Sequence, residues 1–243
     1  MGILGNFVHS VSPGAHKALV KTVRREFEIA PPRWIYAEPH IHAFLREFFA
    51  GTTGTFIEAG ANNGLHRSNT IYLENALGWQ GYLIEAIPHL FVECRRNRPN
   101  STCIHCGLVP PEYEEQSVPL VFMNSMSMVD SDENFLDMEE HRRKYDTVRA
   151  RIDPLDGTKF MAPARTLTDV MGEHGFPEIT FMSLDVEGFE LGVLRGTDFD
   201  RVRPRYILIE DWDESGINTL LEDKGYRVKK RLGSKDVFYE SVS

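Results

Sequence analysis

One stretch, from Thr55 to Gly64, constrains the fold of this chain more than any other part of the sequence. It reads TFIEAGANNG: Thr55 to Ile57 have the β-branched and aromatic side chains of a short buried strand, Glu58 ends that strand, and a glycine-rich turn follows. Residues 68–77 can then form a helix. A strand, a tight turn and a helix in this order predict a small-molecule cradle at the carboxyl end of a strand in an open α/β sheet.

The residues of the turn indicate which ligand the cradle prefers. A dinucleotide fingerprint needs three glycines, so that backbone amides can approach a pyrophosphate, but here Asn62 stands at the middle position and only Gly60 and Gly64 remain. A carboxylate at Glu58 would repel phosphate and attract an ammonium or sulfonium group. S-adenosylmethionine carries both cations and no phosphate, so we assign Glu58, Gly60, Asn63 and Gly64 to that cofactor. An ordinary strand-to-helix turn explains these residues equally well on their own.

A second predicted strand, Tyr82 to Glu85, also ends in an acid. Glu85 lies about 20 residues beyond Gly64, the spacing at which an acid accepts the ribose hydroxyls in nucleoside-binding α/β folds. We therefore assign Glu85 and the adjacent Ala86 to the cofactor, and we expect its adenine ring near Gly107, after a third short strand. The alternative for Glu85 is a solvated charge at the end of a strand.

Several blocks of the sequence occur together in a known family. They are Ile57–Gly64, Gly81–Ala86 followed by Pro88, Arg165–Asp169, Ser183–Glu190 and Val193–Gly196. In these blocks the chain resembles the FkbM family of S-adenosylmethionine-dependent methyltransferases, from about Thr55 to Tyr239 with a divergent middle. The resemblance implies a class I, Rossmann-like methyltransferase fold and, as acceptor, a hydroxyl of a sugar or other small metabolite. Leu184 departs mildly from the family, in which isoleucine often precedes the aspartate.

The order of the predicted elements indicates the same α/β fold. Strands alternate with helices up to 206–210, and 226–231 and 237–239 then flank Gly233-Ser234 as a hairpin. We expect a doubly wound, mostly parallel seven-stranded sheet with this antiparallel hairpin at its edge. Residues 1–54 are expected to form a helical leader, and residues 55–243 the methyltransferase domain.

The section from about residue 124 to 164 is long, charged and irregular. We expect it to be a lid over the acceptor site, with a helix over 132–151, because long connections inside compact domains are usually functional or mobile. A surface excursion stabilised by charge pairs one helical turn apart is an equally good explanation.

Acids at the strand ends are also the candidates for catalysis. Methyl transfer to an alcohol needs alignment and a base that accepts the proton, and we assign these roles to Asp185, Glu187 and Glu210. Asp185 and Glu187 are two residues apart and point to one side of an extended chain, so they form either a base with its partner or two ligands for a divalent cation such as Mg²⁺. No metal site is firmly predicted, and Asp185 and Glu210 are its candidates. Capping of the following helix by Glu187 or Glu190 is the alternative.

The histidines and cysteines indicate functional roles less clearly than the acids do. His66, beside the glycine turn, is a candidate for contact with cofactor or acceptor, and His141, in the expected lid, is a candidate base if the lid closes, although a lone histidine is more often structural. Cys103 and Cys106 form one C-x₂-C pair without a second pair, and residues three apart in a strand point to opposite faces. With Cys94 they are the three cysteines of the chain, and we expect packed thiols rather than zinc or disulfides.

The amino-acid composition of the chain limits the classes of partner that it is expected to bind. The net charge of −9 argues against nucleic acid, and a hydrophobic content of 42% supports a substantial core in a chain of 243 residues. We find no secretory leader and no apolar run long enough for a bilayer, so we expect a cytoplasmic protein that does not bind membranes. Its partner is expected to be a small-molecule acceptor, and a homo-oligomer remains open.

The leading hypothesis is therefore an S-adenosylmethionine-dependent O-methyltransferase. An NAD-type oxidoreductase on a similar sheet is an alternative, which the missing third glycine disfavours. A non-catalytic nucleoside-binding protein that kept the cradle is another.

Overall fold

The computed structural model describes residues 37–130, 137–148, 153–211 and 214–242. The chain divides into two compact units, residues 1–33 and 34–243, and all described residues lie in the second unit. Most of the leader predicted over residues 1–54 therefore lies outside the described residues.

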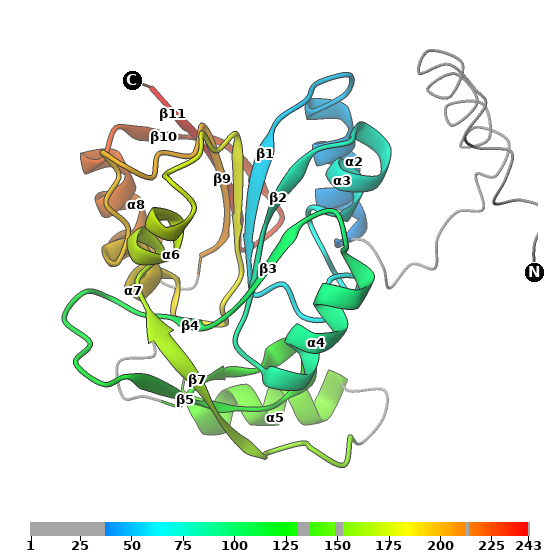
Figure 1. The fold of residues 1–243 in the computed structure, drawn as a ribbon, viewed down its shortest axis with the longest axis vertical. Coiled ribbons are helices and arrows are strands. Elements are labelled where there is room, and N and C mark those ends of the chain that lie inside the picture. The colour runs from blue at the N-terminus through cyan, green and yellow to red at the C-terminus, as the bar shows by residue number, and fades with distance from the viewer. Residues whose placement is uncertain (1–36, 131–136, 149–152, 212–213, 243) are drawn as a thin grey trace, which may run out of the picture. The chain divides into compact units, whose positions relative to one another are not determined.

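A seven-stranded sheet forms the centre of the described unit (Figure 1). Its strands are β1 (Thr55–Ala59), β2 (Gln80–Glu85), β3 (Thr102–His105), β8 (Phe181–Leu184), β9 (Tyr206–Glu210), β10 (Tyr226–Leu232) and β11 (Asp236–Ser241). They lie in the order β10-β11-β9-β8-β1-β2-β3. The strands from β9 to β3 are parallel, whereas β11 is antiparallel to both β9 and β10. This confirms the predicted mostly parallel sheet with a C-terminal hairpin at its edge.

Helices cover both faces of this sheet (Figure 1). One face carries α2 (Pro39–Phe48), α3 (Ile71–Leu77) and α4 (Pro88–Asn97), and the other carries α6 (Leu167–Glu173), α7 (Glu190–Arg195) and α8 (Glu214–Asp223). Successive side chains of a strand point to opposite faces, so Phe56 of β1 packs in the first core and Ile57 in the second. None of the helices in the described part of the chain is both long enough and apolar enough to cross a bilayer.

A second, four-stranded sheet is built from the segment after β3. Its strands are β4 (Gly107–Leu108), β5 (Ser117–Val121), β6 (Met128–Val129) and β7 (Lys159–Arg165), in the order β4-β7-β5-β6. The 3₁₀ helix η2 (Asn124–Met126) and the helix α5 (Met138–Val148) belong to the same part of the chain. A small core of Val121, Met123, Met128 and Tyr145 joins α5 to this sheet.

The sequence analysis did not predict this second sheet. β7 contains Pro163, which argues against a strand, and most of its side chains are at least partly exposed, so it lacks an apolar run. It nevertheless pairs with β5 from Lys159 to Pro163 and with β4 beyond that. The helix predicted over 132–151 is described over 138–148 as α5. The section predicted to be irregular is thus largely regular structure where it is described.

The cysteines are free thiols, as expected. Cys103 packs against the core that includes α2, and Cys106 belongs to the core on the opposite face, in agreement with their spacing. The Sγ atom of Cys94 on α4 lies 3.7 Å from that of Cys103.

Candidate active site

A cavity of about 440 Å³ opens at the carboxyl ends of β1, β2, β8 and β9, where open α/β sheets bind their ligands. Its volume suits a small molecule. Leu108, Leu120 and Val129 of the second sheet line the cavity together with the strand ends. Its polar and charged lining residues are Asn62, His66, Arg67, Glu85, Asn124, Ser125, Ser127, Lys144, Asp185, Glu187, Glu210 and Lys235.

Unusual backbone conformations concentrate around this cavity. Five non-glycine residues of the described chain have positive φ, and four of them line the cavity: Asn62, Arg67, Asn124 and Glu187. Left-handed conformations of such residues are energetically unfavourable and gather at ligand and active sites. The unusual backbone conformations therefore indicate the same ligand site as the carboxyl ends of the strands do.

The loop between β1 and α3, residues 60–70 and called here the β1–α3 loop, begins at Gly60 with a φ of +80°. A side chain at Gly60 would bring its Cβ to 1.8 Å from the carbonyl oxygen of Asp185, so only glycine fits. The amides of Gly60 and Ala61 both donate to the carbonyl of Ile84 at 3.0 Å. These contacts hold the start of the loop against the ends of both neighbouring strands.

Glu85, the last residue of β2, lines the cavity and orders this loop. Its carboxylate accepts hydrogen bonds from the amides of Asn62 and Ile87, both at 2.7 Å. Burial raises the pKa of Glu85 to about 7, although these hydrogen bonds oppose the shift. Each carboxylate oxygen can accept a second hydrogen bond, so the group can still accept from ligand hydroxyls.

Of the residues predicted to bind a cofactor, Gly60, Glu85, Ala86 and Gly107 line the cavity, whereas Glu58, Asn63 and Gly64 do not. The Asn63 side chain accepts from the amides of Leu65 and His66 and so shapes the loop from within. Gly64 packs against Cys94 and Arg98: an added Cβ would lie 2.7 Å from the Cγ of Arg98.

The expectation that Glu58 guards the mouth of the cavity needs correction. Glu58 lies within β1, which ends at Ala59, and its side chain shares the face of Phe56. Its carboxylate accepts hydrogen bonds from the hydroxyls of Ser68 and Thr70 and from the amide of Asn69, at 2.7–2.9 Å. Glu58 therefore anchors the end of the β1–α3 loop.

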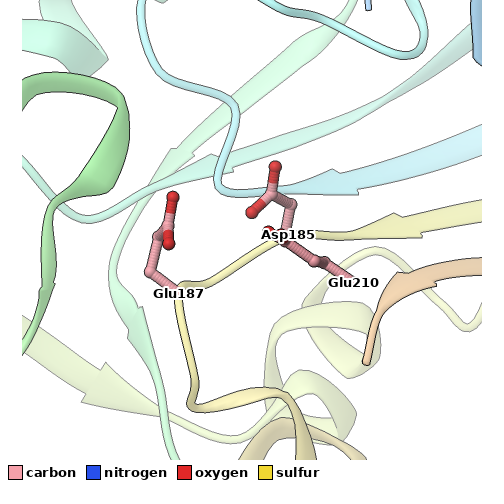
Figure 2. A group of neighbouring side chains, drawn as sticks. All are labelled: Asp185, Glu187 and Glu210. Atoms are coloured by element: carbon pink, nitrogen blue, oxygen red, sulfur yellow. The ribbon is translucent and has the colours of Figure 1, made fainter. Parts of the chain in front are cut away.

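The three predicted catalytic acids do come together, and we call Asp185, Glu187 and Glu210 the cavity cluster (Figure 2). Asp185 directly follows β8 and Glu210 ends β9, so adjacent parallel strands deliver them to one rim. One carboxylate oxygen from each residue lies within 4.8 Å of the others. Desolvation, followed by repulsion from neighbouring acids, raises the pKa of Asp185 and of Glu187 well above the ordinary range.

Glu190 fixes the loop that carries this cluster. It is buried, and its carboxylate accepts from the amides of Val186 and Gly188 at 2.9 and 3.2 Å. From the sequence we considered Glu190 as a cap of the following helix; its carboxylate instead holds amides of the loop before α7, and the N-cap residue Phe189 makes no side-chain cap hydrogen bond. Burial raises the pKa of Glu190 to about 8.

Two basic groups lie beside the cavity cluster, one in the β10–β11 hairpin, which the sequence did not connect with the site, and one in α5, the helix of the expected lid. Lys235, in the β10–β11 hairpin, lies 3.5 Å from Glu210. His141 of α5 lies 3.6 Å from Glu187 and 3.0 Å from the carbonyl of Met126, and burial lowers its pKa. His141 does not line the cavity, whereas His66 does.

Asn62, Arg67, Lys144 and Lys235 line the cavity and were not predicted to bind a ligand. Only Asn62 had a local signal, because Asn tolerates the left-handed conformation of a turn. The other three are surface-type charges whose position depends on distant parts of the chain.

Chemically, the cavity lining offers two kinds of groups. The carboxylate of Glu85, beside the β1–α3 loop and the apolar residues near Gly107, is a hydrogen-bond acceptor. In the cavity cluster, a carboxylate of raised pKa can take a proton from a hydroxyl group. The same oxygens are the ligands that a hard divalent cation prefers.

Comparison with known proteins agrees with this geometry. A family model described as the methyltransferase FkbM domain matches residues 58–228. The methyltransferase sdnD of Sordaria araneosa is 27% identical over 199 residues, which cover 72% of this chain and 74% of that protein. A methyltransferase FkbM from Methylobacillus flagellatus superimposes with a TM-score of 0.51 at 14% identity, over 84% of this chain and 48% of the other. The chain thus spans about half the length of that solved structure, with which it shares the class I, Rossmann-like fold.

Proposed function

Because the chain belongs to the methyltransferase FkbM domain family, we propose that it transfers a methyl group from S-adenosylmethionine to a hydroxyl oxygen of a sugar or other small metabolite. The observation that carries the proposal is the lining of one cavity. It contains a nucleoside-type acid, Glu85, at the end of β2, and three carboxylates grouped at the ends of β8 and β9.

Three features support S-adenosylmethionine as the cofactor. Gly60 and Asn62 bring the backbone of the β1–α3 loop to the cavity, and Asn62 stands where a pyrophosphate-binding loop needs glycine. Glu85 can accept ribose hydroxyls, and Ala86 and Gly107 offer an adjacent wall for the adenine. When bound, this cofactor supplies an activated methyl group on a sulfonium, which suits a cavity rich in carboxylates.

The cavity cluster is proposed to act on the acceptor. Asp185 would accept the hydroxyl proton as the oxygen bonds to the methyl carbon and the sulfur–methyl bond breaks, with S-adenosylhomocysteine as the leaving group. Glu187 and Glu210 would hold that base and the acceptor in line. The raised pKa of Asp185 makes it a stronger base than an ordinary carboxylate. Alternatively, the three carboxylates hold a divalent cation that binds the acceptor oxygen. This alternative rests on the carboxylate geometry alone.

Calorimetry with the purified chain tests the cofactor. We expect S-adenosylmethionine and S-adenosylhomocysteine to bind and NAD not to bind. Replacing Glu85 by Ala should weaken S-adenosylmethionine about tenfold or more, because a charge-assisted acceptor is lost. Glu93→Ala on the exposed side of α4 is the matched control. Binding of NAD instead, or an unchanged dissociation constant in Glu85→Ala, would contradict the cofactor assignment.

Transfer of a labelled methyl group to a panel of glycosides and other hydroxyl compounds tests the reaction. We expect product with at least one hydroxyl acceptor and none with matched methyl ethers. Activity that survives EDTA would favour the base, whereas activity lost to EDTA and restored by Mg²⁺ would favour the cation. Cofactor binding without transfer to any acceptor would instead point to a nucleoside-binding protein.

A further inference from the structure

Arg98, directly after α4, lies buried behind the β1–α3 loop with its side chain only 1% exposed. Its Nη1 donates to the carbonyl of Gly64 at 2.9 Å and to the hydroxyl of Ser68 at 3.1 Å. Its Nη2 donates to the hydroxyl of Thr70 at 3.0 Å, and its Nε to the carboxylate of Glu74 at 2.8 Å. One guanidinium group therefore connects the middle of the loop, its end and the first turn of α3.

The neighbouring residue, Asn97, continues this contact. Its side-chain amide donates to the carbonyl of Asn63 at 2.8 Å, so two successive residues at the end of α4 hold two successive carbonyls of the loop. The opposite side of the same loop forms part of the cavity wall, through Gly60 and Asn62. The end of α4 therefore supports the loop from behind without entering the cavity.

The chemistry of these contacts requires arginine. Its planar fork supplies several donors in fixed directions, whereas a lysine ammonium group is a single point on a flexible stem. Gly64 makes room for this arginine, because a Cβ at position 64 would lie 2.7 Å from the Cγ of Arg98. Glu58, 3.7 Å from Nη1, and Glu74 compensate the buried charge.

Stability alone is a weak reason for this arrangement. Removing a guanidinium and two carboxylates from water opposes folding about as much as their attraction favours it, so a well-packed apolar group could serve as well. What an apolar group cannot do is hold the backbone carbonyl of Gly64 and the hydroxyls of Ser68 and Thr70 in one geometry. The distinctive consequence of Arg98 is the conformation of the loop.

We propose that Arg98 is a positioning residue for the methyl donor: it fixes the β1–α3 loop in the conformation that binds the cofactor, and it acts without touching the cofactor itself. This inference rests on the proposed use of S-adenosylmethionine, because the same loop carries Gly60 and Asn62 to the cavity. The role follows from the position of the guanidinium behind the loop and from its hydrogen bonds to Gly64, Ser68 and Thr70.

The test compares Arg98→Lys with Arg96→Lys in the full chain. Arg96 lies on the exposed side of α4 two residues away and is the matched control. Hydrogen exchange of residues 60–70 is measured without ligand, and S-adenosylmethionine binding by calorimetry. For Arg98→Lys we expect faster exchange confined to the loop and a dissociation constant raised about tenfold, with kcat at saturating cofactor changed less than about twofold. Arg96→Lys should change none of these.

The outcomes separate the two proposals. If exchange in the loop is unchanged in a folded Arg98→Lys variant, the positioning role is overturned whatever the cofactor is. If wild type fails to bind S-adenosylmethionine, the proposed function falls, while faster exchange in the variant would still support the hold of Arg98 on the loop. Should Arg98→Lys not fold, Asn97→Ala removes an exposed donor to the same loop, and unchanged exchange there would also overturn the role.

Discussion

Glu58 lies in β1 and Asp185 directly follows the neighbouring parallel strand β8, and both looked alike in the sequence, as acids where a buried strand ends. Their surroundings differ. Glu58 is part of what we call the Arg98 cluster, in which hydroxyls, amides and a guanidinium surround two carboxylates: Glu58, Ser68, Thr70, Glu74 and Arg98. Asp185 instead faces two further carboxylates across an open cavity. The first arrangement neutralises charge to support a loop, and the second concentrates charge where a ligand can bind.

The difference teaches how to separate a supporting acid from a functional one. In the Arg98 cluster, buried donors use the carboxylate oxygens, so little capacity remains for a ligand. In the cavity cluster, desolvation and then repulsion between neighbouring acids raise the pKa of Asp185 and Glu187, and a bound proton or cation would relieve the repulsion. The four predictions below test this contrast, from the largest expected effect to the smallest.

Asp185→Asn should affect activity far more than stability. Loss of a positioned base lowers methyl transfer by about 10²–10⁴-fold. Removing one of three repelling carboxylates should leave the thermal unfolding midpoint unchanged or raise it. A methyl-transfer assay and a thermal melt on the same preparation give both numbers. A variant that keeps its activity, or one that loses activity only because it unfolds, would break the contrast.

Arg98→Met should have the opposite signature. It leaves Glu58 and Glu74 buried without their cation, which lowers the free energy of unfolding by about 3–5 kcal/mol. Urea unfolding measures this change. Combining Arg98→Met with Glu58→Gln and Glu74→Gln should recover part of the lost free energy of unfolding, because the buried carboxylates without a cation are then gone. Wild-type stability in the single variant would show that the Arg98 cluster is not a compensated ionic network.

The acids around the cavity should make the stability of the protein depend on pH. Glu190 has a pKa of about 8, against 4.5 for the ordinary side chain, so between these values the folded state binds more protons than the unfolded state. Stability therefore falls as pH rises through this window, by at most about 1.4 kcal/mol per pH unit for one group. Glu85, with a pKa of about 7, adds to the same trend.

Glu190→Gln keeps an acceptor for the amides of Val186 and Gly188 but removes the titration. Urea unfolding from pH 5 to pH 8 should therefore give a flatter dependence in this variant than in wild type, with a residual slope from the other acids of raised pKa, Glu85, Asp185 and Glu187. Equal slopes in the two proteins would show that Glu190 does not titrate in this range.

Glu173→Gln sets the baseline, with the smallest expected effect. Glu173 pairs with Arg165 at 2.8 Å on the exposed surface of α6, where solvent screens the interaction. We expect no measurable change in the urea midpoint at physiological salt. A change comparable with that of Arg98→Met would mean that burial is not what distinguishes the Arg98 cluster.

The fold was predictable from the sequence because its signals are local. The apolar runs of β1, β2 and β9, Pro88 at the start of α4 and Gly233 in the hairpin each reflect propensities within a few residues. β7 was missed for a local reason too, since Pro163 and its exposed side chains hide a strand that only its pairing with β5 reveals.

The site was only partly predictable, because its contacts are not local. In a sheet covered on both faces, alternation assigns Glu58 and Ala59 to opposite faces but does not say which face is next to the cavity. Arg98 ends a run of basic residues that reads as a solvated helix end, and only Glu58 and Glu74, far away in sequence, explain its burial. Lys235 reaches Glu210 only because the hairpin pairs with β9.

The second sheet has one more property that matters for how such a protein diversifies. The amide of Phe122 donates to the carbonyl of Thr158 and the amide of Gly157 donates to the carbonyl of Phe122, so the two ends of the segment that includes β6 and α5 are paired with each other. The intervening residues supply Ser125, Ser127 and Lys144 to the cavity. A segment with joined ends can be exchanged as a cassette, since loop closure depends only weakly on length. A change confined to this segment would thus alter part of the cavity lining and leave the strand ends and the β1–α3 loop as they are.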